Sequence, residues 1–220
     1  NYQDAMMQTL AQNGNGNAAY IDTLSEAQKV LVNEATSTLF PIAKDVKIQV
    51  EFNPATVAEY RLIGYETRAL NREDFNNDKV DAGEIGSGHK VTAIYEITPV
   101  SVANKLLEPS RYQAQATASG KSNELAILRV RYKLPKENQS TLIETAITKS
   151  EHENNSAYQP EENFSVAVAG FAQLLRGSNY SGDFNYDKVI ELAQANKGKD
   201  EYGYRTEFIQ LVRKAKIAQE

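Results

Sequence analysis

The chain has 220 residues, of which 41% are hydrophobic and 24% charged, the composition of an ordinary globular protein that is long enough to bury a core. Its net charge of −5 and thinly spread Lys and Arg argue against a nucleic-acid partner, because phosphate binding depends on clustered basic side chains. It has no cysteine, which excludes disulfides, thiol catalysis and cysteine-ligated zinc.

Residues 1–43 have the pattern expected at the end of an α/β domain. The expected elements, in order, are a helix ending at Gly14, a strand over 17–22 and a helix over 23–40 that stops at Pro41. Thr23 or Ser25 is available as the N-cap of the second helix. Because a lone strand between two apolar helix faces needs neighbours, this pattern predicts partner strands that the sequence lacks.

From Lys44 the hydrophobic period changes to two, which predicts β-strands. The five predicted strands cover residues 46–52, 57–69 with a bulge at Gly64, 91–100, 125–134 and 141–148. In the fourth strand, Arg129, Arg131 and Lys133 share one face, where we expect them to meet solvent. For residues 44–150 this predicts an antiparallel β-sandwich or a sheet packed on a helix.

Residues 151–220 begin with a polar linker and continue with helical patterns. The first helix is predicted to stop at Gly177, and the second to run from an N-cap at Asn185 to Gly198. A third covers 202–218, and the helical segment is expected to pack on the β-rich region. The chain as a whole is therefore expected to be α+β, divided at about 43 and 150.

The loop over residues 74–89 is the strongest candidate for a binding site. Asp74, Asn76 and Asp78 have the spacing that gathers oxygen atoms around calcium. An EF-hand is disfavoured, because Lys79 stands where glycine is needed and Ile85 where glutamate is needed. A different calcium loop that uses Asp81 or Glu84 stays open, beside the simpler interpretation of a solvated turn rich in glycine. No metal ligand is assigned here.

Other chemistry has little support in the sequence. The two histidines, His89 and His152, lie far apart and outside any metal-ligand or nucleophile–base spacing. There is no nucleophile elbow, phosphate-cradling loop or dinucleotide fingerprint. We therefore assign no catalytic or cofactor-binding residue and no cofactor, and expect the chain not to be an enzyme. A hydrolase with a carboxylate pair is a remote alternative, since no pair can be placed across a cleft from sequence.

The run from Lys44 to Ile97 resembles the segment just downstream of the von Willebrand factor A (VWA) domain in a group of bacterial cell-envelope proteins. Those proteins end in a conserved C-terminal domain of unknown function. Residues 1–32 look like the final helix, edge strand and closing helix of the VWA domain. The resemblance continues in GFAQLLRGS, YDKVIELA and YGYRTEFIQLVRKA, and is weakest over 101–123 and 135–160.

The resemblance implies an extracytoplasmic location, in the periplasm or cell envelope. Any export or lipoprotein signal is expected upstream of Asn1, and no apolar run is long enough to span a bilayer, so no membrane contact by the chain itself is expected. The VWA adhesion motif Asp-x-Ser-x-Ser does not occur in residues 1–220, so its metal-binding role is not carried over. Strands from before the VWA domain are a further expected source of neighbours for the β-region.

The expected function is that of a non-enzymatic protein-interaction or scaffold module. Its partner is expected to be protein, with recognition shared with the upstream VWA portion. The alternative is a calcium- or carbohydrate-binding module that uses the 74–89 loop.

Overall fold

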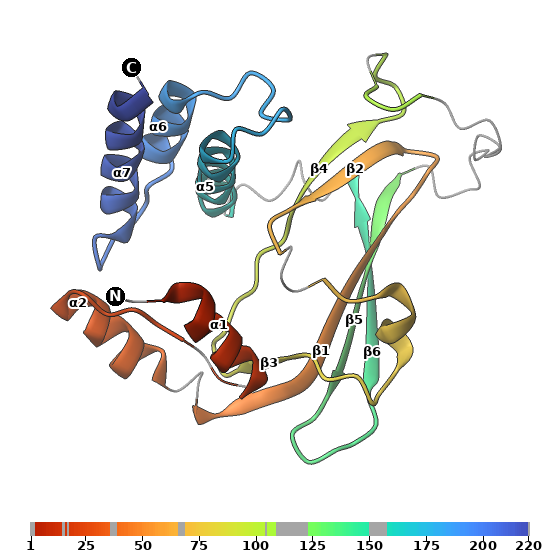
Figure 1. Cartoon of the computed structure of the whole chain (residues 1–220). Coiled ribbons are helices and arrows are strands. Elements are labelled where there is room, and N and C mark those ends of the chain that lie inside the picture. Colours follow the sequence, from red (N-terminus) through yellow and green to blue (C-terminus); the bar gives the residue numbers. More distant parts are fainter. Residues whose placement is uncertain are drawn as a thin grey trace. The chain divides into compact units, whose positions relative to one another are not determined.

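The computed structural model describes residues 3–14, 16, 18–35, 39–65, 69–103, 105–108, 123–149 and 158–219. These residues form helices and two antiparallel sheets, so the expected α+β class is confirmed (Figure 1). The chain forms two compact units. Unit 1 comprises Asn1–Thr56, Thr67–Thr92 and Ala116–Ile147, and unit 2 comprises Val57–Glu66, Ala93–Gln115 and Thr148–Glu220. The division of the sequence at 43 and 150, and a sandwich of two sheets, stay predictions.

Unit 1 begins with short helical elements, α1 (Asp4–Asn13), α2 (Leu24–Gln28) and the π-helical turn η1 (Lys29–Asn33). Thr23 is the N-cap of α2, as expected, and its Oγ1 accepts a hydrogen bond of 3.2 Å from the amide of Glu26. The strand expected at 17–22 is wrong over the described residues 18–22, because no neighbouring strand pairs with them. Pro41 opens a strand, and residues 36–38 lie outside the described residues.

The sheet of unit 1 contains β1 (Pro41–Phe52), β3 (Gly83–Gly86), β5 (Glu124–Lys133) and β6 (Thr141–Thr148). Their order is β3-β1-β5-β6, and the long β1 is antiparallel to both of its neighbours (Figure 1). Predicted strand 141–148 is confirmed at both ends, and β5 lies within one residue of its prediction.

The two faces of this sheet differ in chemistry, as the alternating pattern predicted. Ile48 pairs with Val130 and Phe52 with Ala126 on what we call the apolar face, and Lys47 pairs with Arg131 on the charged face. The coverage of the faces was not predicted. Lys47 is only 3% exposed, whereas its neighbour Ile48 is 45% exposed. A segment of residues 71–82, which includes the 3-10 turn η3 (Arg72–Asn76), contacts the charged face.

Unit 2 contains a two-stranded antiparallel sheet of β2 (Val57–Ile63) and β4 (Ile94–Pro99). Both strands are shorter than predicted. Gly64, expected at a bulge, has φ +82° and directly follows the last residue of β2, so it ends the strand. Arg61 of β2 donates to Glu96 of β4, and also to Gln173 Oε1 at 2.9 Å.

The helices of unit 2 are α5 (Gln159–Leu175), α6 (Tyr186–Ala195) and α7 (Tyr204–Gln219). They enclose an apolar core formed by the following buried residues: Ala167, Phe171, Val189, Ala193, Ile209 and Val212. Asn185 caps α6 as expected, with its Oδ1 accepting a 2.9 Å hydrogen bond from the amide of Lys188. No helix among the described residues has the length and apolar character required to cross a membrane.

Replacing Gly170 by alanine is expected to destabilise unit 2. A helical Gly→Ala change usually stabilises by about 1 kcal/mol. Here a Cβ atom would lie 2.5 Å from the ring of Phe184, so we expect a loss of about 1–3 kcal/mol from overpacking. Denaturant unfolding of Gly170→Ala measures it, with Val166→Ala at an exposed position of α5 as the control. A Gly170→Ala protein as stable as the parent would contradict this packing.

Candidate functional site

The three oxygen ligands suggested by the sequence do not converge on one point. Asp74 lies in η3 and accepts a 3.1 Å hydrogen bond from Asn71, whereas Asn76 Oδ1 accepts one of 3.1 Å from Arg131. Asp78 accepts from Ser140. The other two candidate ligands, Asp81 and Glu84, are both exposed, and Glu84 lies in β3. Within the described part of the chain, no three His, Asp or Glu side chains are grouped as metal ligands would be.

A lysine side chain occupies the position where a calcium loop would present its carbonyls to the ion. Lys47 projects from β1, and its Nζ donates to the carbonyl oxygens of Asp74, at 3.1 Å, and Asn77. These carbonyls belong to the 74–78 stretch that has calcium-like spacing. The lysine ammonium group can satisfy carbonyl oxygens as a metal ion does, because it carries a positive charge and three hydrogen-bond donors. The positive charge under this loop is therefore part of the chain itself.

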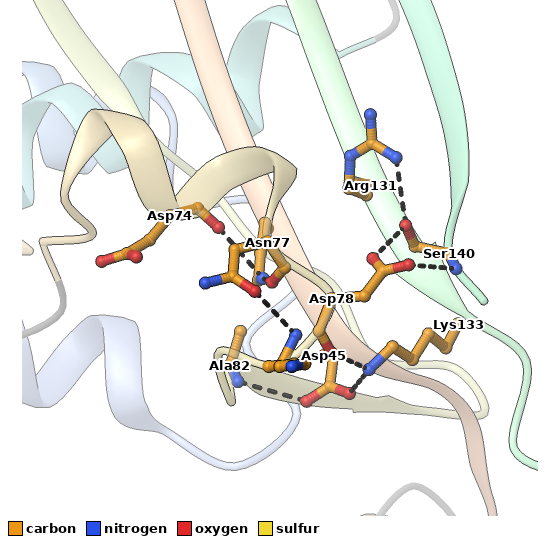
Figure 2. Close-up of polar contacts among 10 residues, drawn as sticks. Asp45, Asp74, Asn77, Asp78, Ala82, Arg131, Lys133 and Ser140 are labelled. Carbon is orange, nitrogen blue, oxygen red and sulfur yellow. Dashed lines mark hydrogen bonds and ion pairs between the residues drawn. The ribbon is translucent and has the colours of Figure 1, made fainter. Parts of the chain in front are cut away.

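A second buried lysine fixes the far end of the same segment. Lys133 of β5 donates to Asp45 Oδ2 and to the carbonyl oxygen of Asp78, both at 2.6 Å (Figure 2). Asp45 has φ +52°, a left-handed conformation that aspartate tolerates better than most residues, and it lies at the register shift between Lys44 and Lys47 in β1. This irregularity in β1 places the carboxylate of Asp45 beside the ammonium group of Lys133.

Asp45 is held in its charged form. Burial raises the pKa of this carboxyl, but hydrogen bonds from Lys133 and from the amide of Ala82 outweigh burial, and the net pKa lies below the usual value. The amide of Ala82 donates to Asp45 Oδ1 at 3.3 Å, so both carboxylate oxygens are engaged (Figure 2). Asp45 thus joins β1, β5 and the end of the 71–82 segment.

Asp78, Ser140 and Arg131 form the third part of the network. The Asp78 carboxylate accepts from the hydroxyl of Ser140 at 2.5 Å and from its amide at 3.3 Å, and these bonds lower its pKa. Arg131 donates to the same hydroxyl at 3.0 Å and lies over the ring of Phe75, 5.6 Å from its centroid. The serine hydroxyl is thereby engaged as donor and as acceptor, an arrangement that orients a loop (Figure 2).

The arrangement as a whole covers the part of the charged face that contains Lys47 and Lys133. Lys47, Lys133 and Arg131 supply positive charge, and Asp45 and Asp78 together with backbone carbonyls balance it. Such a network holds a segment in place, since a buried ammonium group is tolerated only where acceptors surround it. We name these contacts the lysine lock.

Sequence reasoning found the 74–89 loop but missed most of the lock. The expectation that Lys133 meets solvent is wrong, because the 71–82 segment covers it. Lys47 and Ser140 gave no signal, since a lysine in an alternating strand is usually exposed. His89 is exposed, and His152 lies outside the described residues.

Calcium is expected to leave the melting temperature of the chain unchanged, because the lysine ammonium groups already engage the carbonyls it would need. The measurement is a thermal melt with calcium, magnesium or chelator. Asp78→Ala should melt lower under all three conditions, since Ser140 loses its acceptor, and the exposed Glu84→Ala should match the parent. A calcium-specific rise that both variants abolish would contradict the lock.

Asp45→Asn is expected to destabilise the chain at neutral pH by roughly 2–3 kcal/mol, because it leaves the Lys133 ammonium without its counter-charge. The folded-state pKa of Asp45 is depressed, so its contribution is complete above the unfolded-state value of about 4 and disappears as pH falls through the folded-state pKa. Urea unfolding from pH 7 to pH 2.5 should therefore show the two proteins converging in acid. The control is Asp183→Asn, which breaks a pair on the surface. A pH-independent difference would contradict this assignment.

Comparison with known proteins places the chain in a family. Residues 37–217 match the family described as "Uncharacterized protein YfbK, C-terminal". The chain is 45% identical over 214 residues to "Uncharacterized protein YfbK" of Escherichia coli (strain K12), a match that covers 96% of this chain and 36% of that relative. No solved structure matches. The chain therefore belongs to the YfbK C-terminal family, and it spans about a third of the length of the relative it matches.

Proposed function

We propose that the chain is a non-enzymatic protein-interaction and scaffold module of a bacterial envelope protein that carries a VWA domain. Its role is to bind protein through the sheet of unit 1, and the partner surface is shared with the VWA portion upstream. Location in the periplasm or envelope is part of the proposal and follows from the sequence resemblance.

The proposal depends on the open apolar face of that sheet. Ile48 is 45% exposed and Ile143 is 49% exposed. Glu144 of β6 pairs with Arg129 on the charged face. Residues an odd number of positions away along a strand face the opposite side, so Ile143 and Ile147 point to the apolar face. Among the described residues of unit 1, the buried apolar side chains are Phe75 and Ala126, and Phe75 lies against Arg131. A sheet that buries lysines on one face and exposes isoleucines on the other is suited to a protein partner on the apolar face.

The helical residues that precede the sheet support the proposal that another part of the same polypeptide takes part in this interaction. Leu24 is 86% exposed, and Met6, Leu10 and Leu31 are also exposed. This part precedes the family match, which begins at residue 37, although the match to the relative includes 96% of the chain. Apolar helices without a core of their own are expected where a preceding domain packs on them. Residues 1–32 resemble the end of a VWA domain, so the preceding domain in this proposal is the VWA domain.

The lysine lock favours this proposal over the calcium- or carbohydrate-binding alternative. The carbonyl oxygens of Asp74, Asn77 and Asp78 accept from Lys47 and Lys133, so binding a cation to these carbonyls would require displacing a lysine. A scaffold benefits from such a region, because it keeps the sheet rigid behind the face that binds.

The test is photo-crosslinking in cells, with benzoylphenylalanine in place of Ile48 in the full-length gene product. We expect a discrete crosslinked product, either within the polypeptide or with one partner protein, because this side chain lies on the apolar face. The matched control is the same replacement at Ile217 of α7, which is 72% exposed. A Val130→Glu change opposite position 48 should remove the product in protein that still melts cooperatively. Equal, diffuse labelling at positions 48 and 217 would contradict the proposal.

A further inference from the structure

The outer edge of β6 has the properties of a strand that is built to be paired. β6 ends the strand order of its sheet, and no described strand lies beyond it. It has eight residues, longer than the usual strand of about five or six. Most of its side chains are exposed, and its sequence TLIETAIT is rich in β-branched residues.

Edge strands normally carry features that prevent further pairing, and the sequence of β6 carries few of them. Such features include proline, a bulge, or charges that repel another strand. β6 has no proline, and its one charged residue, Glu144, accepts from Arg129 Nε at 2.7 Å, a guanidinium that also pairs with Glu51. The exposed Ile143 and Ile147 extend the apolar face up to this edge. A long edge strand with a single charged residue, beside exposed apolar side chains, favours a further strand there in the complete protein.

Two longer segments of this chain lie outside the described residues, 109–122 and 150–157, and their sequences can be compared with what the added strand requires. Neither contains Val, Ile, Leu or Phe. A strand that continues the apolar face next to Ile143 and Ile147 needs such residues at alternate positions. The relative has nearly two thirds of its length outside the match, and the matched family is described as the C-terminal part. The portion before this chain is therefore the better source.

We propose that a β-strand from the portion of the same polypeptide that precedes this chain pairs with the outer edge of β6 over residues 141–147. This strand is expected to alternate apolar and polar residues, with its apolar side chains beside Ile143 and Ile147. The proposal deepens the proposed interaction function and rests on it, because the added strand would be one element of the partner that covers the apolar face.

Amide hydrogen exchange read by mass spectrometry tests the proposal. In an antiparallel ladder, alternate residues bond to opposite neighbours, so β5 alone protects about half of the amides of β6. We expect the number of slowly exchanging amides in a peptide covering 141–148 to rise about two-fold from the isolated chain to the full-length gene product. A peptide covering 124–133 is the internal control, because β5 lies between two strands and should be protected in both proteins.

A second measurement separates this proposal from the proposed function. The chain has no cysteine, so Ile48→Cys gives one maleimide-reactive position on the apolar face of the isolated chain. The corresponding position can be followed by mass spectrometry in the full-length protein. Slower labelling there together with unchanged exchange in β6 would overturn the added strand and leave the interaction function standing. No change in either would overturn both. Protection of β6 that grows with concentration of the isolated chain would assign the edge to a second copy and overturn the proposal.

Discussion

The structure of unit 1 depends on two buried ammonium groups that must be surrounded by acceptors. Lys47 and Lys133 lie under the 71–82 segment, where an unsatisfied charge would cost several kcal/mol. The acceptors come from carbonyls of that segment and from Asp45. The sheet and the 71–82 segment therefore stabilise each other. This requirement covers the lysine-bearing part of one face of the sheet, and the opposite, apolar face keeps exposed side chains such as Ile48.

The two units are stabilised by different forces. Unit 2 has an apolar core among α5, α6 and α7, with Phe171 against Phe208 at 5.6 Å between ring centroids. Such a core contributes through burial of apolar area. Unit 1 is held by strand pairing and directed polar contacts. Because polar contacts contribute little net free energy each, unit 1 has more to gain from a partner that buries its apolar face.

The predictable parts of the molecule were those set by local periodicity. Alternation assigned Ile48 and Lys47 to opposite faces, and cap chemistry located Thr23 and Asn185. The strand at 17–22 failed because pairing is not a local property. The lock was missed for the same reason, since only tertiary packing decides that Lys47 is buried while Ile48 is not. Calcium-like spacing drew attention to the segment that contacts the buried lysines, but it could not show that the positive charge beneath this segment is a side chain.

The pairing of Asp45 with Lys133 also constrains how this sequence can drift. Asparagine or glycine would keep the left-handed backbone at position 45, but neither would neutralise the ammonium group. Losing either member alone leaves the other in a buried site, where it must gain or release a proton to become neutral. Descendants of this sequence are therefore expected to keep both members of the pair or to replace them together.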